Sequence, residues 1–304
     1  MDNLEKDMNR LANDLVDELN KSLGFRQDGF MRLFLKPLVW KPMIRFSELA
    51  TKFDYRIVNE GFQRASDWFI SHFVDRVKTF GSENVPASGP LVIASNHPGA
   101  YDSLVIAANI PRDDLKIISS NIPFIKKLPV TSEHMIFSTP DAHVRMGVAR
   151  QAIRHLRNGG ALLVFARGTM DPDPAFMPGS KEELKNWTSS LGLFLRKVPH
   201  TKLAITLVSG VLTKKYIYHP ATLFRNGRVN KQRLSEFFQV MNQLLVPGKL
   251  MVSPSLSFAP SLTLEELGNH RDIKLISKEI VKKAQEQFET HKSQFLVPMQ
   301  VNAS

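Results

Sequence analysis

Short apolar runs separated by amphipathic segments constrain the fold of this chain more than any other feature. Runs that suit buried strands fall at 91–95, 116–119, 135–138, 161–166, 203–209 and 250–258. Segments with the three- and four-residue apolar spacing of helices follow them, at 102–109, 144–156, 184–198, 234–245 and 267–288. Gly159-Gly160 and Pro247-Gly248 end two of these helices. The alternation predicts an α/β fold with a mixed sheet flanked by helices.

Two pairs of polar residues predict where helices begin. Ser180 is followed by Glu183, and Thr263 by Glu266, which is the spacing of a capping box. We expect the first pair to open the helix that contains 184–198. We expect the second pair to open the last helix of the chain.

The N-terminal part of the chain follows a different pattern. Residues 4–19 have an apolar stripe at helical spacing opposite an acidic face, and 47–80 continue as helix. Turn-forming Gly and Pro residues between 81 and 90 end this part. We therefore expect an N-terminal helical region over residues 1–80 and an α/β domain over residues 81–304.

Residues 30–46 contain no acidic residue and carry four cations among large apolar side chains, namely Arg32, Lys36, Lys41 and Arg45. The cations recur every four or five positions, so they share one face if the segment is helical. Pro37 and Pro42 are expected to kink or break that helix. Cations beside Trp and Phe suit a helix that lies in the headgroup region of an anionic membrane. A helix packed on the body of the protein fits the same pattern, and both interpretations stay open.

The charge of the chain favours an anionic partner. The net charge is +11 and the sequence pI is about 9.8, which suits a nucleic acid, an anionic membrane or a phosphorylated small molecule. A soluble protein with a basic surface has the same charge. The basic residues are spread over many segments and no nucleic-acid-binding module is recognisable, so we expect no nucleic-acid partner.

The chain has no cysteine, which excludes disulfides, a cysteine nucleophile and cysteine-ligated zinc. Its first residues are acidic and lack the apolar core of a signal peptide. No apolar stretch approaches the ~20 residues that a spanning helix needs. We expect a cytoplasmic protein that is peripheral on the membrane surface.

The most informative segment for chemistry runs from the strand at 91–95 to the helix that begins near Asp102. His97 falls in the turn between them, at the carboxyl end of a strand, where α/β enzymes commonly place reactive groups. Asp102 can cap the helix and also reach back to His97. A carboxylate on one ring nitrogen fixes the tautomer and supports the imidazolium that forms on proton abstraction. The other nitrogen is then free to act as general base on an alcohol.

These residues resemble the signature of a known family. Asn96-His97, four residues and then Asp102 are similar to the motif of the phospholipid/glycerol acyltransferases, typified by lysophosphatidate acyltransferase. The Gly- and Pro-containing approach at 81–90 is similar as well. Residues 164–169, Val-Phe-Ala-Arg-Gly-Thr, resemble the family's Phe-Pro-Glu-Gly-Thr segment.

The resemblance implies a reaction and an assignment of residues. A fatty acyl group passes from a thioester of coenzyme A or acyl carrier protein to a hydroxyl of a lysolipid or related acceptor, with no metal or other cofactor. His97 is the implied general base, and Asp102 orients it. Backbone N–H groups of Gly168 and Thr169 are candidates to bind the thioester oxyanion. The other candidates for substrate binding are Asn96, Lys126, Lys127, Arg145 and Arg167.

The chain departs from the family where the acceptor binds. Arg167 stands in place of the family's Glu and Met170 in place of its Arg, while its other basic positions read Ser120 and Thr139. We therefore expect an acceptor other than simple lysophosphatidate. Arg167 is the candidate to replace the missing charge, on a phosphate of the acceptor or of coenzyme A, unless it pairs with Asp171.

One other interpretation of the protein remains beside the enzyme. A non-catalytic lipid-binding relative of the family fits the altered 164–169 segment, whereas the intact His97 and Asp102 favour catalysis. The acidic, Pro-containing segment with Asp171 and Asp173 has no histidine partner for a metal, and we interpret it as a solvated turn.

Overall fold

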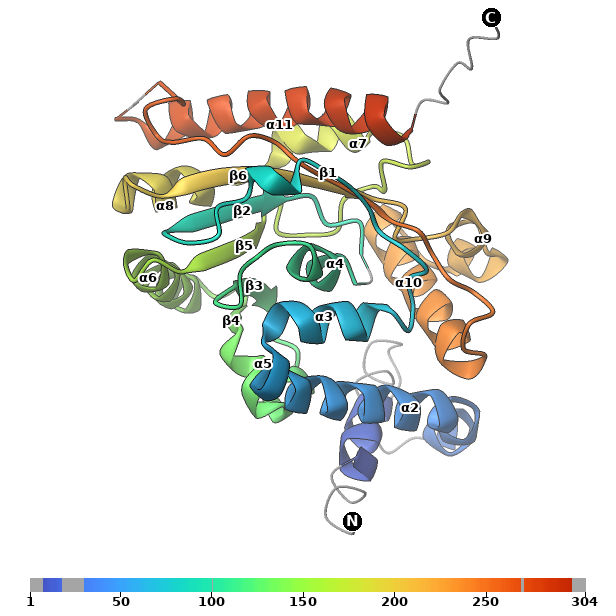
Figure 1. Cartoon of the computed structure of the whole chain (residues 1–304). Coiled ribbons are helices and arrows are strands. Elements are labelled where there is room, and N and C mark those ends of the chain that lie inside the picture. Colours follow the sequence, from blue (N-terminus) through green and yellow to red (C-terminus); the bar gives the residue numbers. More distant parts are fainter. Residues whose placement is uncertain (1–7, 18–29, 100, 269–270, 297–304) are drawn as a thin grey trace, which may run out of the picture.

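The computed structural model describes the chain except for residues 1–7, 18–29, 100, 269–270 and 297–304. Within the described part, seven strands form one mixed sheet in the order β1-β7-β6-β2-β5-β3-β4 (Figure 1). Their bounds are β1 Lys78–Phe80, β2 Leu91–Ser95, β3 Lys116–Ser120, β4 Met135–Ser138, β5 Ala161–Phe165, β6 Lys202–Ser209 and β7 Ser255–Phe258. β6, β2, β5, β3 and β4 are mutually parallel, and β7 pairs antiparallel with β6. The predicted α/β class with a mixed sheet is confirmed.

Helices cover both faces of the sheet. The α-helices are α2 Phe30–Glu60, α3 Phe62–Ile70, α4 Asp102–Ala108, α5 Pro129–Glu133, α6 Ala142–Arg157, α7 Ser180–Glu183, α8 Ser190–Lys197, α9 Lys214–Ile217, α10 Arg228–Leu245 and α11 Ile273–Phe295. Short 3-10 helices are η1 Ser82–Asn84, η2 Ile125–Lys127, η3 Leu184–Asn186 and η4 Pro220–Phe224. Residues 8–17 are also helical.

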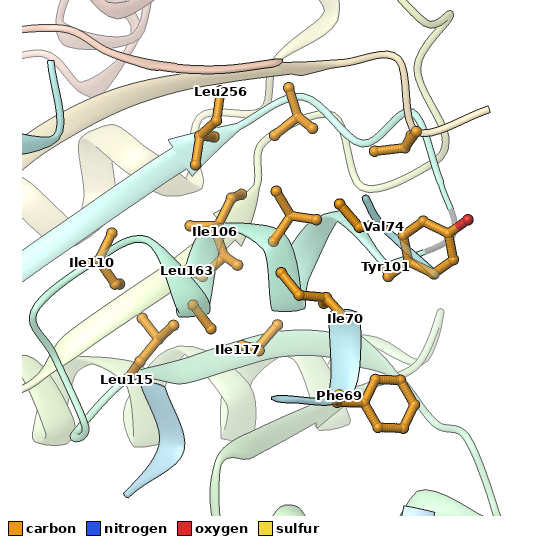
Figure 2. Close-up of a cluster of buried hydrophobic side chains, with 14 of the residues drawn as sticks. Phe69, Ile70, Val74, Tyr101, Ile106, Ile110, Leu115, Ile117, Leu163 and Leu256 are labelled. Atoms are coloured by element: carbon orange, nitrogen blue, oxygen red, sulfur yellow. The ribbon is translucent and has the colours of Figure 1, made fainter. Parts of the chain in front are cut away.

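Alternation along the central strands builds two cores. In β2, Ile93 packs with side chains of α2, α3 and α4, whereas its neighbour Val92 packs with side chains of α6, α8 and α11. Figure 2 shows the first core, where Ile106 of α4 lies among Leu163 of β5 and Ile117 of β3. Because both faces of the sheet are covered, the central strands are apolar throughout, which is the signal read in the sequence.

Helix α2 continues through Pro37 and Pro42, so of the predicted kink or break the break is not formed. Each internal proline removes a backbone hydrogen bond and costs about 3 kcal/mol. Packing offsets that cost, because Val39 and Met43 are buried against the helix at 8–17 in a third apolar cluster. No helix in the described part of the chain is long and apolar enough to cross a membrane.

The cations of 30–46 divide between the protein and solvent. Lys36 donates to Asn13 at 2.8 Å, and Arg45 donates to the carbonyl of Leu244 in α10 at 3.0 Å. Lys41 is exposed. The side chain of Arg32 lies outside the described residues. Part of this segment therefore packs on the body of the protein, as one of the two interpretations of residues 30–46 required. The other interpretation, contact with an anionic membrane, stays a proposal.

Three helix boundaries differ from those predicted. Ser180 does not cap a helix, because Gly179 occupies the N-cap and the Ser180 hydroxyl donates to the Met177 carbonyl at 2.6 Å. The predicted single helix is divided into α7, η3 and α8. Thr263 and Glu266 do make the bonds of a capping box, but they close a turn, and Asp272 caps α11. The predicted helix over 47–80 ends at Ile70 in α3, since its last residues join the sheet as β1.

Candidate active site

His97 lies just beyond the carboxyl end of β2, in a turn that the adjacent strand fixes. The Asn96 side chain donates to the Val208 carbonyl and accepts the Val208 N–H, both at 2.9 Å. This amide extends the pairing of β2 with β6 by one residue. Asn96 is only 2% exposed, and its two hydrogen bonds hold the turn in place.

Asp102 turns back toward His97. Its Oδ2 accepts from His97 Nδ1 at 2.7 Å and from the Gly99 N–H at 3.1 Å. Asp102 is the first residue of α4 and Tyr101 is the N-cap, so the predicted capping of this helix by Asp102 is not formed. The carboxylate is 1% exposed and has only these partners among the described residues, which fixes Nδ1 as the protonated nitrogen of a neutral ring.

The ring of His97 is held but accessible. It stacks on Phe165 of β5, with ring centroids 4.3 Å apart, and its side chain is 30% exposed. No described residue hydrogen-bonds to Nε2. Burial lowers the pKa of His97, but the carboxylates of Asp102, Glu236 and Asp171 raise it more in total, to about 9.

Asp171 locks the loop after β5 against the His97 turn. Its Oδ2 accepts the His97 N–H at 2.9 Å, and its own N–H donates to the His97 carbonyl at 2.7 Å. Asp173 accepts N–H groups of Ala175, Gly210 and Leu212. Both aspartates are at least 98% buried, so the predicted solvated turn is wrong. Burial raises the pKa of each to about 6, against these hydrogen bonds.

No group of three or more His, Asp or Glu side chains gathers as a metal site in the part of the chain that the structure describes. The buried carboxylates around His97 bind backbone N–H groups and the imidazole instead. Their chemistry in this site is therefore that of hydrogen-bond acceptors.

Arg167 is committed to neighbouring carboxylates. Its Nη2 lies 2.9 Å from Glu183, its Nε lies 3.7 Å from Asp171, and its Nη1 donates to the Met170 carbonyl at 2.8 Å. Of the roles expected for Arg167, the structure contains the pairing with Asp171. Arg228 of α10 reaches the same place, since it donates to the Met170 carbonyl at 2.9 Å.

Helix α10 contributes a row of buried glutamines that sequence reasoning missed. Gln232 Nε2 donates to the carbonyls of Pro98 and Asp171, both at 2.6 Å. Gln239 donates to the Tyr101 hydroxyl, which in turn donates to Gln243. Glutamines seven and four positions apart, which fall on one helix face, were the available signal.

Glu236 on the same helix was also missed. Its carboxylate raises the pKa of His97. The carboxylate also lies close to Gly99 of the His97 turn, because Oε2 would be 3.2 Å from a Cβ atom at that position. Glu236 is the sole acidic residue between Glu183 and Glu265, and this isolation was the signal that could have found it.

The two candidate oxyanion donors differ in availability. The Gly168 N–H donates to the Phe165 carbonyl at 2.9 Å within the turn after β5. That bond closes the turn and already uses the Gly168 N–H. Thr169 has no such backbone bond in the described turn, and it remains the candidate of the pair.

The remaining cations lie beyond neighbouring strands. Lys126 and Lys127 follow β3, where Lys126 lies 5.3 Å from the ring centroid of Phe137 and Lys127 pairs with Asp14. Arg145 is exposed on α6, after the edge strand β4. β3 and β4 run parallel to β2, so all three cations follow the same edge of the sheet as His97.

A histidine paired with a buried carboxylate lies at the carboxyl edge of parallel strands, where α/β enzymes commonly place reactive groups. Residues 76–201 match the protein family described as Acyltransferase. The expected resemblance is confirmed over this segment, which is an acyltransferase domain. No curated protein matches the chain at a significant level. A similar solved structure is the 1-acyl-sn-glycerophosphate (LPA) acyltransferase PlsC from Thermotoga maritima, with 17% identity, 82% of each chain covered and a TM-score of 0.46.

Proposed function

We propose that this enzyme transfers a fatty acyl group from an acyl thioester to a hydroxyl of a lysolipid or related lipid acceptor. The observation that carries the proposal is the 2.7 Å contact between His97 Nδ1 and Asp102, with Nε2 left open. The family match to residues 76–201 supports the reaction class. The thioester is that of coenzyme A or acyl carrier protein.

In the proposed step, Nε2 of neutral His97 takes the proton of the acceptor hydroxyl as its oxygen attacks the thioester carbon. The carbon–oxygen bond forms, the tetrahedral intermediate collapses, and the carbon–sulfur bond breaks. The imidazolium returns the proton to the leaving thiolate, so no acyl-enzyme is needed. Asp102 stabilises the imidazolium through Nδ1, and the Thr169 N–H is the candidate donor to the oxyanion.

Cations at the edge of the sheet support an anionic substrate. Lys126 and Arg145 are the proposed contacts for the phosphates of coenzyme A or for the acceptor headgroup. Lys127 is partly occupied by Asp14, and Arg167 by Glu183, so both are weaker candidates. The absence of a basic residue at Ser120, Thr139 and Met170 supports an acceptor other than simple lysophosphatidate.

Acyl transfer by the purified protein, with radiolabelled acyl-CoA and a panel of lysolipids, tests the proposal. His97→Ala should lower turnover by roughly 10²–10⁴-fold, which is the contribution of one general base. Asp102→Asn should also lower turnover strongly, because it releases the tautomer. His143→Ala is the matched control, since His143 is exposed at the start of α6. Near-normal turnover of His97→Ala would disprove the mechanism.

The second candidate is a non-catalytic lipid-binding relative. The observation that favours it is the engagement of Arg167 with Glu183, which occupies part of the altered motif. Binding of lysolipid without acyl transfer, unchanged in His97→Ala, would support this candidate over the enzyme.

We further propose a peripheral protein on the cytoplasmic surface of the membrane, in which the cationic face of residues 30–46 contacts anionic lipid.

A further inference from the structure

Between α9 and α10 lies an exposed apolar surface with cationic residues at its border. Three large side chains there are highly exposed, with Tyr218 at 65%, Leu223 at 75% and Phe224 at 89%. Leu223 and Phe224 end η4, and Tyr218 directly follows α9. We call these three residues, together with the cations Lys214, Lys215 and Arg225, the η4 surface.

The exposure of these side chains is built into the fold. Thr222 is buried, and its hydroxyl donates to the carbonyls of His219 at 2.7 Å and Ile217 at 3.2 Å. The Thr222 N–H donates to His219 and the Arg225 N–H donates to Thr222. Because Thr222 fixes the turn from inside, the two residues that follow it project into solvent. Exposed apolar side chains held in this way mark a contact surface.

The charges around the η4 surface favour an anionic bilayer as its binding partner. No acidic residue occurs from residue 184 to residue 235. In the same stretch, Lys214, Lys215 and Arg225 lie within a few residues of the exposed side chains, and Lys231 lines the same pocket as Leu223. Apolar side chains that project from a cationic border suit the boundary between headgroups and acyl chains. A phosphate backbone of nucleic acid would match the cations but would leave Leu223 and Phe224 in water.

The η4 surface adjoins a groove whose lining includes Gln232, a residue that is hydrogen-bonded to the His97 turn. This groove has a volume of about 460 Å³, and its lining includes Tyr218 and Leu223 as well as Lys231 and Gln232. Gln232 donates to the carbonyls of Pro98 and Asp171, which belong to the two loops that hold His97. An amphiphile that enters from the η4 surface therefore meets apolar walls, cations and then the back of the His97 turn.

We propose that the η4 surface docks on an anionic membrane, with Leu223 and Phe224 entering the headgroup region. This contact is separate from the one proposed for residues 30–46. It places the mouth of the groove against the bilayer, so the lipid acceptor reaches the enzyme without crossing water. The membrane contact stands without any assumption about catalysis, whereas the delivery of the acceptor rests on the proposed function.

The absence of cysteine allows a direct test of insertion. In Phe224→Cys, the single thiol is labelled with a polarity-sensitive fluorophore and mixed with phosphatidylcholine vesicles, with or without phosphatidylglycerol. The emission should shift to the blue with the anionic vesicles, and added salt should reverse the shift. Tyr55→Cys is the matched control, because Tyr55 is 70% exposed on α2. No shift at position 224, or an equal shift at position 55, would overturn the proposal.

Vesicle sedimentation measures the contribution of the surface to binding. Leu223→Ser with Phe224→Ser should weaken partitioning onto anionic vesicles by about 100-fold, since each buried side chain contributes about tenfold or more. Lys214→Gln with Lys215→Gln should weaken it by on the order of tenfold. Tyr55→Ser with Val58→Ser removes equally exposed apolar side chains elsewhere and should leave partitioning unchanged.

Two further outcomes would contradict the membrane interpretation. Light scattering that shows the Leu223 and Phe224 variant converting an oligomer to a monomer, with vesicle binding intact, would make the η4 surface a contact between copies of the chain. Equal partitioning of this variant and the wild type would show that residues 30–46 suffice.

Activity separates the membrane contact from the chemistry. The Leu223 and Phe224 variant should lose acylation of lysolipid embedded in vesicles but keep acylation of the same lysolipid in detergent micelles. Equal loss in both would place the η4 surface in the catalytic machinery and overturn delivery from the membrane. If the wild type transfers no acyl group in either form, the proposed function fails, while the labelling and sedimentation results still decide the membrane contact.

Discussion

Glu236 allows the electrostatic control of His97 to be tested in one substitution. Burial lowers the pKa of His97, but the carboxylates of Asp102, Glu236 and Asp171 raise it to about 9. A group with that pKa is neutral in about 1% of molecules at pH 7 and in about 10% at pH 8. Only the neutral ring can accept the proton of an alcohol. With His97 as the proposed general base, we therefore expect the free enzyme to be mostly in its inactive protonation state at neutral pH.

The value of kcat/KM should consequently rise about tenfold per pH unit through neutral pH and level off near the pKa of about 9. Glu236→Gln removes one negative charge that favours the imidazolium, so the pKa of His97 falls. The rising limb should move to lower pH, and activity at pH 7 should increase. The plateau at high pH should drop slightly, because a base with a lower pKa is weaker.

The assay is the initial rate of acyl transfer across this pH range at subsaturating acceptor. Glu265→Gln is the matched control, since Glu265 is exposed and lies outside the site. Its profile should superimpose on that of the wild type. A wild-type midpoint near the ordinary histidine value of about 6.5 would refute the reasoning. A Glu236→Gln profile identical to that of the wild type would refute it as well.

The remaining predictions concern the frame around His97. Asp173→Ala leaves three backbone N–H groups without their buried acceptor. Urea unfolding should therefore show a loss of about 3 kcal/mol or more in the free energy of unfolding. An unchanged midpoint would contradict the role assigned to this carboxylate. Asn96→Ala leaves the N–H and carbonyl of Val208 unpaired and should cost about 2–4 kcal/mol in the same assay. Arg167→Ala should lower kcat and the melting temperature, because Arg167 is held by Glu183; a change in acceptor KM alone would show instead that Arg167 binds substrate.

The sheet was predictable because its central strands are buried on both faces. The runs at 91–95 and 161–166 are continuous and apolar, and the strands β2 and β5 match them to within one residue. The spacing of His97 and Asp102 was equally informative. The six residues between the end of β2 and the start of α4 leave little freedom, and the structure joins the two side chains at 2.7 Å.

The buried aspartates were not predictable from local pattern. Asp171 and Asp173 stand among prolines and look like a surface turn, yet distant backbone groups compensate their burial. Asp173 accepts from Gly210 and Leu212, which follow β6. The capping box at Ser180 failed for a related reason, because Glu183 is drawn to two arginines and leaves the helix start. In each case a long-range partner outweighs the local preference.

The charges around the second motif explain why its sequence looks altered. The family has Glu where this chain has Arg167, but Glu183 supplies a carboxylate 2.9 Å from that arginine. The family has Arg where this chain has Met170, but Arg228 donates to the Met170 carbonyl at 2.9 Å. Both guanidinium groups lie near Glu183, and Arg167 also lies near Asp171, so two cations face two carboxylates beside the His97 loop. Helix α10 therefore supplies two charged groups near the His97 turn, namely Arg228 and the carboxylate of Glu236.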